Sequence, residues 1–254
     1  DAMSGGTGDD TYIVNHAGDT TTENASEGTD TVESSTVWTL GANIENLTLT
    51  GSLDINGNGH SGNNVIRGNS GDNILSGNGG NDSLFGMAGN DTLNGGSTWD
   101  SLLGGAGNDT INAGGGNDWI RGEDGNDVLN GQDGRDRIFG EAGDDTINGG
   151  NDVDTLTGGT GDDIFDYNAL SEIGDVITDF ETGTNGDLLD LVGILAAVGY
   201  GGVDALGDGR VRAQQSGGDT VIEIDTSGSN DFALVATLQS VTASEVVADN
   251  WILS

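Results

Sequence analysis

The feature that most constrains the fold of this chain is a period of nine residues. From Gly59 to Asp166 the sequence divides without insertion into twelve nonapeptides of the pattern G-G-x-G-x-D-x-U-x, where U is a large apolar residue. The segment Gly104 to Asn112 (GGAGNDTIN) is a regular example. A fixed internal period of this kind indicates a repeat architecture in which each unit buries its apolar side against its neighbours.

The sixth and eighth positions of the nonapeptide are the most regular. The sixth is aspartate in ten repeats and asparagine in the first two. The eighth is always large and apolar, at Ile66, Leu75, Leu84, Leu93, Leu102, Ile111, Ile120, Leu129, Ile138, Ile147, Leu156 and Phe165. Because side chains alternate across a strand, we expect positions seven to nine to form a short strand with the eighth residue in the core. A solvated linker would not keep twelve apolar residues in register.

The composition indicates that cations are needed for folding. The 254 residues include 43 Asp and Glu but only 6 Lys and Arg, which gives a net charge of −37, and there is no cysteine. This charge excludes binding to nucleic acid or to an anionic membrane through a positive surface. No apolar run approaches the roughly 18 residues of a membrane span. With a small apolar core and strong self-repulsion, the chain needs something that neutralises its carboxylates.

The nonapeptide resembles the calcium-binding repeat of secreted bacterial RTX (hemolysin-type) proteins. The resemblance implies an all-β fold, a parallel β-roll or β-helix in which two successive nonapeptides make one coil. It also implies calcium ions between stacked turns, up to about ten, bound by sixth-position side chains and turn carbonyls. Oxygen ligands in flexible geometry suit Ca²⁺.

The ligands that the resemblance implies are carried over position by position. The side-chain ligands are Asn64, Asn73, Asp82, Asp91, Asp100, Asp109, Asp118, Asp127, Asp136, Asp145, Asp154 and Asp163. The backbone carbonyl ligands are those of Gly86, Ala88, Gly104, Gly105, Ala106, Gly107, Gly122, Asp124, Gly140 and Ala142. We expect weaker sites at Asn64 and Asn73, which lack charge, and where Thr98 and Asp152 replace the fourth-position glycine. The module should be largely unfolded at low calcium and fold outside the cell.

Three regions are expected along the chain: an irregular solenoid segment over 1–58, the repeat array over 59–166, and a C-terminal cap over 167–254. Residues 1–4 fit positions six to nine of a nonapeptide, and 5–13 form a complete one. We therefore expect the chain to begin within a repeat, as the C-terminal part of a longer protein.

The region after the array resembles the segment that follows RTX repeats in type I secretion substrates. It should contain a short helix within 188–198 and strands at 210–214, 219–225 and 232–238, which would cover the open end of the solenoid. The final residues, Asp249 to Ser254, resemble the uncleaved C-terminal signal of that export route. The alternative is that these residues simply close the cap.

One outward face of the array is unusual. Positions seven and nine of the odd repeats carry aromatic and basic residues, and we single out Phe85, Trp119, Arg121, Arg137 and Phe139. Exposed aromatic stripes are uncommon on monomers. This odd face is therefore expected to bind a ligand or partner, or to be covered by the cap.

The function expected from the sequence is a calcium-binding structural and export module of a larger bacterial protein, secreted or on the cell surface, with the type I secretion machinery as a partner. An enzyme site is not expected in this chain, because the two histidines are isolated and neither H-E-x-x-H nor G-x-S-x-G occurs. The alternatives are an extracellular polysaccharide-binding module, like the R-modules of mannuronan C5-epimerases, or the tail of an RTX adhesin, protease or lipase. Ice binding would need a flat threonine array that the turns lack.

Overall fold

The computed structural model describes residues 1–254 apart from 184, 203–204, 247–249 and 254. Almost all regular secondary structure of the described residues is strand, and the one helix among them is α1 (Val192–Ala197). This helix is too short to cross a membrane, and no other described segment is a spanning helix. The chain divides into two compact units, Asp1–Gly125 and Asn126–Ser254, which are described in turn.

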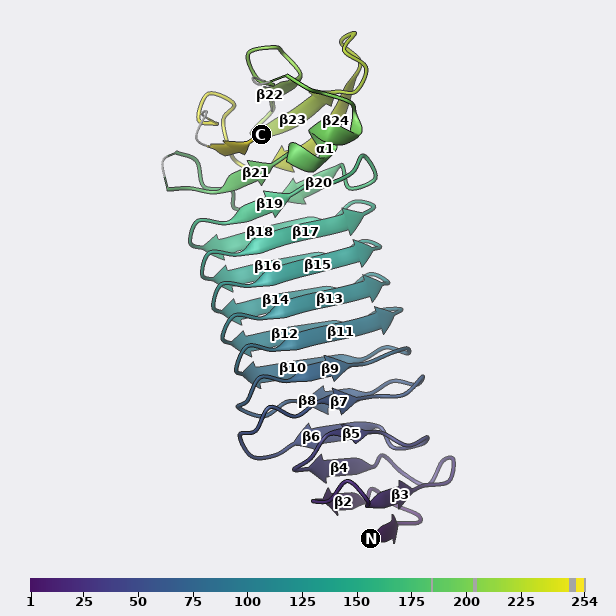
Figure 1. Ribbon diagram of the computed structural model, residues 1–254. Coiled ribbons are helices and arrows are strands. Elements are labelled where there is room, and N and C mark those ends of the chain that lie inside the picture. The colour runs from purple at the N-terminus through teal and green to yellow at the C-terminus, as the bar shows by residue number, and fades with distance from the viewer. Residues whose placement is uncertain (184, 203–204, 247–249, 254) are drawn as a thin grey trace. The chain divides into compact units, whose positions relative to one another are not determined.

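The first unit is a solenoid with two parallel sheets as its walls (Figure 1). One wall has the order β2-β4-β6-β8-β10-β12-β14, the other has the order β5-β7-β9-β11-β13, and β1 pairs with β3. The strands are β1 (Ala2–Ser4), β2 (Thr11–Val14), β3 (Thr20–Thr22), β4 (Thr31–Ser34), β5 (Trp38–Thr39), β6 (Asn46–Leu49), β7 (Gly57–Asn58), β8 (Val65–Arg67), β9 (Ile74–Ser76), β10 (Ser83–Ala88), β11 (Thr92–Ser97), β12 (Ser101–Ala106), β13 (Thr110–Gly115) and β14 (Trp119–Asp124).

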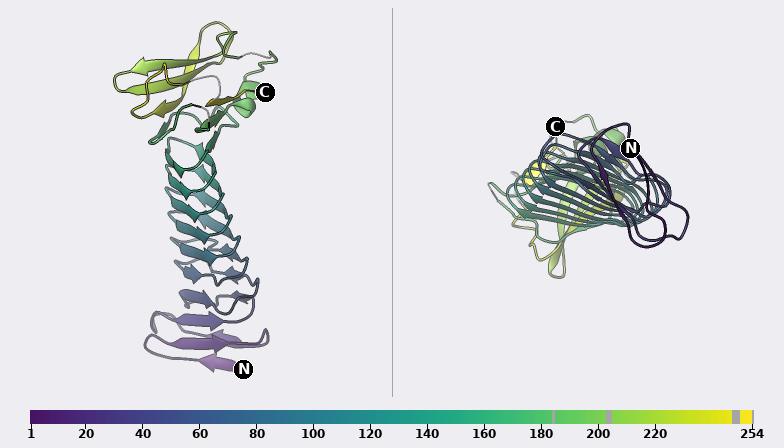
Figure 2. Two further views of the ribbon diagram at one scale, coloured as in Figure 1. Left: turned by 90° about the vertical axis from the view of Figure 1, so that its left-hand side faces the viewer. Right: turned by 90° about the horizontal axis from the view of Figure 1, so that it is seen from below.

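Neighbouring coils of the repeat array are 18 residues apart along the chain. Leu84 pairs with Leu102 on one wall and Leu93 with Ile111 on the other. Figure 2 shows this stacking of β10, β12 and β14 from a second direction. The N-terminal coils are less regular, because the coil that begins at β4 is separated from its two neighbours by 20 and 15 residues.

The second unit begins with the same two-walled solenoid and ends in an antiparallel sheet. Its walls have the orders β16-β18-β20-β24-β23-β22 and β15-β17-β19-β21-β25. The strands are β15 (Val128–Asp133), β16 (Arg137–Ala142), β17 (Thr146–Asn151), β18 (Thr155–Thr160), β19 (Ile164–Asp166), β20 (Asp175–Ile177), β21 (Leu188–Asp190), β22 (Val211–Ser216), β23 (Asp219–Asp225), β24 (Phe232–Leu238) and β25 (Trp251–Ile252). Strand β24 pairs in parallel with β20 and antiparallel with β23.

These observations confirm the predicted fold class. The eighth residue of every nonapeptide is buried, with at most 1% of its surface exposed. The helix and the three antiparallel strands occur where the alternation of the sequence predicts them. The predicted strands are too short, however: β10 to β18 have six residues each, because each strand continues through positions one to three of the next turn, of which positions two and three pair with the neighbouring coil. The boundaries at 58/59 and 166/167 stay a prediction.

The turns need residues with positive φ at two positions. The fourth residue of each turn is usually glycine, and Thr98 and Asp152, which replace it, have φ values of 77° and 78°. The second residue is also in the left-handed region in most turns, for example at Met87 (84°) and Glu141 (80°). Non-glycine residues rarely adopt this conformation, so these positions carry local strain.

Candidate metal centre

The sixth-position residues of the repeats form two buried rows, one along each edge where turns meet strands. In the first unit the rows are Asn64, Asp82, Asp100, Asp118 and Asn73, Asp91, Asp109; in the second they are Asp136, Asp154 and Asp127, Asp145, Asp163. Each of these residues has at most 2% of its surface exposed. The backbone N–H of one row member donates to Oδ1 of the next member, 18 residues later, at 2.7–2.9 Å.

The second carboxylate oxygen of these aspartates is different. Oδ2 is buried and has no hydrogen-bond partner in Asp82, Asp91, Asp100, Asp145, Asp154 and Asp163. None of the ion pairs among the described residues reaches these carboxylates. An uncompensated buried carboxylate oxygen is costly, and six aligned ones require a common partner.

The Oδ2 atoms of the row aspartates face backbone carbonyls across a small space beside the first residue of the turn, which is glycine in eleven of the twelve repeats. A Cβ at the first-position Gly104 would collide with Oδ2 of Asp109, and it would lie 2.7 Å from the carbonyl oxygen of Gly122 in the next coil. Gly131 is enclosed in the same way by Asp136 and the Gly149 carbonyl. Space thus favours glycine at position one, where Ala113 is the one exception, and the positive φ favours it at position four.

The predicted carbonyl ligands occupy all four positions of the turn. The first-position carbonyls of Gly104 and Gly122 border this space beside aspartate oxygens, and that of Gly86 borders it beside Oδ1 of Asn73. The third-position carbonyls of Ala106 and Asp124 accept the N–H groups of the coil before, at 2.9 and 2.8 Å, and a carbonyl oxygen keeps a second lone pair. Their role as metal ligands stays a prediction.

Burial raises the pKa of the row carboxylates, because the charged form loses its water, and the N–H donated by the preceding coil opposes this rise only in part. The pKa rises to about 6 for Asp82, Asp91 and Asp163, and to about 7 for Asp100, Asp145 and Asp154. Without a cation, these rows would therefore carry partial protonation near neutral pH.

The two asparagines at the start of the rows are satisfied within the protein. Oδ1 of Asn64 accepts the N–H of His60 at 2.8 Å, and its amide nitrogen donates to the carbonyl of Glu45 at 3.2 Å. Asn73 repeats the arrangement with the N–H of Asn69 and the carbonyl of Ile55. Their predicted role as calcium ligands is untested, but neither side chain has an unsatisfied buried atom.

Sequence reasoning missed that the rows continue beyond the last repeat. The N–H of Asp154 donates to Asp175 at 2.9 Å, and that of Asp163 donates to Asp187 at 3.1 Å. These spacings are 21 and 24 residues, so a search for a period of nine does not find them. Oδ2 of Asp187 accepts the N–H of Glu181, whereas the carboxyl group of Asp175 is buried beside the Tyr167 hydroxyl.

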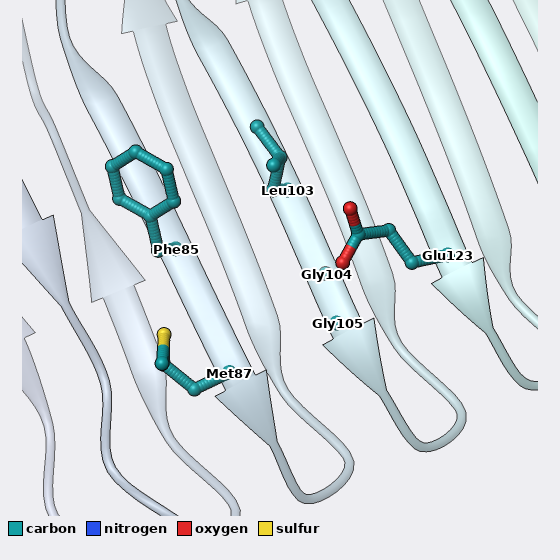
Figure 3. Close-up of a pocket in the computed structure, with 6 residues that line it drawn as sticks. All are labelled: Phe85, Met87, Leu103, Gly104, Gly105 and Glu123. Carbon is teal, nitrogen blue, oxygen red and sulfur yellow. The ribbon is translucent and has the colours of Figure 1, made fainter.

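The odd face is accessible in part. Trp119 is 38% exposed, and the guanidinium of Arg67 lies 4.4 Å from the ring centre of Phe85, a cation–π contact. Figure 3 shows a shallow hollow on this wall, where the side chains of Phe85, Met87, Leu103 and Glu123 stand on neighbouring strands. The predicted binding role of this face is not tested by these contacts.

Residues 58–93, 94–129 and 130–165 match the family model "RTX calcium-binding nonapeptide repeat (4 copies)". The solution structure of the AlgE6R3 subunit from the Azotobacter vinelandii mannuronan C5-epimerase is similar with a TM-score of 0.39 and 26% identity, over 62% of this chain and 80% of that chain. The extracellular lipase LipA from Serratia marcescens has a TM-score of 0.32 and 18% identity, over 91% of this chain and 45% of the lipase. No curated protein matches the sequence.

Residues 58–165 therefore match the RTX calcium-binding nonapeptide repeat, and their strands form parallel β-solenoid walls. Repeats of this kind form a structural fold and bind Ca²⁺ in general. The donor set of the rows fits that ion, because it consists of buried carboxylate oxygens and nearby carbonyls.

Proposed function

We propose that this chain is a calcium-driven folding module in which the ten sixth-position aspartates bind the ions. The observation that carries the proposal is the set of buried Oδ2 atoms without a partner in Asp82, Asp91, Asp100, Asp145, Asp154 and Asp163. A hard divalent cation between two coils would compensate these oxygens and would also bind the first-position carbonyls that border the same space.

The ions would act on folding more than on any chemistry. Each ion bridges turns of two successive coils. The ion therefore binds only the folded state and stabilises that state by mass action. Sites of extracellular type, with Kd of about 10⁻⁴ to 10⁻³ M, fill at millimolar calcium. The chain would therefore be unfolded in cytosol and fold once it reaches a calcium-rich medium.

The test is a Ca²⁺ titration of EDTA-treated protein followed by far-UV circular dichroism, with Mg²⁺ as the control ion. We expect a cooperative coil-to-β transition near millimolar Ca²⁺, and no transition with Mg²⁺, which demands near-ideal octahedral geometry. A complete β spectrum in EDTA at pH 8 would overturn the folding role.

We also propose that the C-terminal residues carry a type I export signal and that the protein is secreted or displayed on a bacterial surface. Asp249 and Ser254 of this signal lie outside the described residues. Trp251–Ile252 forms β25, which pairs with β21, so the same residues close the sheet in the folded protein. Deleting 249–254 should abolish secretion from a host with a matching exporter, whereas the deletion variant still folds on Ca²⁺ addition. Unchanged secretion would exclude the signal.

Polysaccharide binding by the odd face is a second candidate, favoured by the exposed Trp119 and by the cation–π pair of Arg67 and Phe85. Aromatic rings and arginines suit acidic sugars. Binding of a polyuronate to the folded protein should weaken as salt rises and in the Arg67→Ala variant. Binding that is equal in Arg67→Ala and in wild type would exclude this role for the pair.

A further inference from the structure

Three acidic side chains lie together in the N-terminal coils, outside the residues that match the repeat family. Asp10 ends the turn between β1 and β2, while Glu23 and Asp30 belong to the turn between β3 and β4. One oxygen from each lies within 4.8 Å of the others. Glu23 is 7% exposed and Asp30 is 1% exposed, so negative charge is concentrated where little water reaches.

Each of these carboxylates has a buried oxygen without a hydrogen-bond partner, namely Asp10 Oδ2, Glu23 Oε2 and Asp30 Oδ2. Their neighbours bond to the remaining oxygens of Asp30 and Glu23. Asp30 Oδ1 accepts the N–H of Asp10 at 2.8 Å, and Glu23 Oε1 accepts the Tyr12 hydroxyl and the Gly5 N–H. No ion pair in the described part of the chain involves the three. A buried cluster of this charge needs a cation.

The cluster differs from the array in one ligand. In the array, the first-position Gly104 is enclosed by the aspartate of its own repeat and by the carbonyl of Gly122, the equivalent residue of the next coil. A Cβ at Gly5 would likewise collide with Oδ2 of Asp10. The residue 18 positions after Gly5 is Glu23, whose side chain accepts the Gly5 N–H at 3.2 Å. A charged carboxylate therefore enters where the array offers a neutral carbonyl.

We propose that Asp10, Glu23 and Asp30 bind one Ca²⁺ ion outside the repeat array. Carboxylate oxygens are the ligands that this hard cation prefers. Because affinity rises with the number of charged ligands, this site fills at lower calcium than the proposed array sites, which have at most two aspartates each. The bound ion ties the β1–β2 turn to the β3–β4 turn and so stabilises the coils that precede the array.

Tyr12 allows this ion to be observed separately, because its hydroxyl bonds to Glu23. Tb³⁺, a luminescent substitute for Ca²⁺, should be sensitised by tyrosine excitation in the folded full chain. We expect Tb³⁺ emission that is lost when Ca²⁺ displaces Tb³⁺ and that is absent in the Tyr12→Phe variant.

The Glu23→Gln variant keeps both hydrogen bonds of Oε1. It should weaken Tb³⁺ binding at least ten-fold and lower the calcium count in native mass spectrometry by one. The matched control Glu33→Gln, an exposed residue of β4, should change neither.

Absence of Tyr12-dependent emission in the folded wild-type protein would overturn the proposal, even if Glu23→Gln failed to fold. Equal Tb³⁺ affinity in Glu23→Gln and Glu33→Gln would also overturn it. Asp100→Asn separates this site from the array: it should lower the ion count and leave the Tyr12-dependent emission unchanged. Loss of that emission in Asp100→Asn would assign the signal to the array and overturn the N-terminal site.

Discussion

The asparagine turns of the first coil and the aspartate turns that follow have the same length but satisfy their sixth residue in opposite ways. In Asn64 and Asn73 both ends of the amide are hydrogen-bonded, the oxygen to an N–H of the same turn and the nitrogen to a carbonyl of the coil before. In Asp82 and Asp91 one oxygen accepts an N–H from the coil before, and the other oxygen has no partner.

The backbone conformation also differs between the asparagine turns and the aspartate turns. The second residue has positive φ in the turns that precede Asp82 and Asp91, at Asn78 (77°) and Met87 (84°), but not in the first two turns. With that residue in the left-handed region, no turn N–H bonds to the second aspartate oxygen. An asparagine turn thus closes on its own amide, whereas an aspartate turn leaves one carboxylate oxygen without a partner, where we propose that a cation binds. This contrast leads to four predictions, from the largest expected effect to the smallest.

Acid should make the aspartate turns resemble the asparagine turns, because a protonated carboxyl gains an O–H donor. The pKa of Asp100, Asp145 and Asp154 is raised by burial from 3.8 to about 7 in the folded state. A raised folded-state pKa adds stability that is complete below about pH 4 and is lost as the pH rises through about 7. In EDTA, circular dichroism should therefore show more β structure at pH 4.5 than at pH 8. Equal spectra at the two values would contradict the pKa shifts. With Ca²⁺ present the trend should reverse, because protons compete with the ion.

Asp100→Asn introduces an asparagine into the middle of a row and should remove the two sites that Asp100 shares with Asp82 and Asp118. At 1 mM Ca²⁺ the loss in unfolding free energy should be about 1–3 kcal/mol, from two sites with Kd of 10⁻⁴ to 10⁻³ M. Urea unfolding in calcium measures it. The control is Asp72→Asn, a fifth-position change whose oxygen keeps its bond to the Asn90 N–H. Equal losses in the two variants would contradict the role of the rows.

Gly104→Ala should fill the space in front of Oδ2 of Asp109 and weaken calcium binding by roughly ten-fold, about 1.4 kcal/mol. Gly115→Ala is the matched control, because a Cβ there meets nothing within 4 Å. Isothermal titration calorimetry would compare the two. The fold itself should tolerate the methyl group, since Ala113 already carries one at the first position and is fully buried. Unchanged affinity in Gly104→Ala would place the ion elsewhere.

Thr98→Gly should stabilise the calcium-bound protein slightly, by about 0.5–1 kcal/mol, because a β-branched residue at φ 77° is strained. The variant loses the bond from the Thr98 hydroxyl to Asn81, which is exposed and contributes little. Thermal unfolding in calcium is the measurement. Thr92→Gly, within β11, is the control and should destabilise. A lower melting temperature for Thr98→Gly would show that the hydroxyl contact outweighs the strain.

Much of the fold follows from the sequence, because the nine-residue period leaves few arrangements open. The burial of residues such as Leu84 and Ile111 follows from strand alternation alone, and the coil of two nonapeptides follows from the family resemblance. Less could be predicted where spacing changes. Asp175 and Asp187 extend the rows at intervals of 21 and 24 residues, which no fixed period detects, and Glu23 contacts its partners through irregular turns.

The sequence by itself determined the repeat, the apolar core and the large excess of carboxylates. Only the tertiary structure decided which carboxylate oxygens lack a partner. That property depends on turn φ angles and on the neighbouring coil, both of which are fixed only when coils stack. For the same reason, Asn64 and Asp82 occupy equivalent positions in the sequence but differ in the fold. Both polar atoms of the Asn64 side chain are hydrogen-bonded, whereas Oδ2 of Asp82 has no partner.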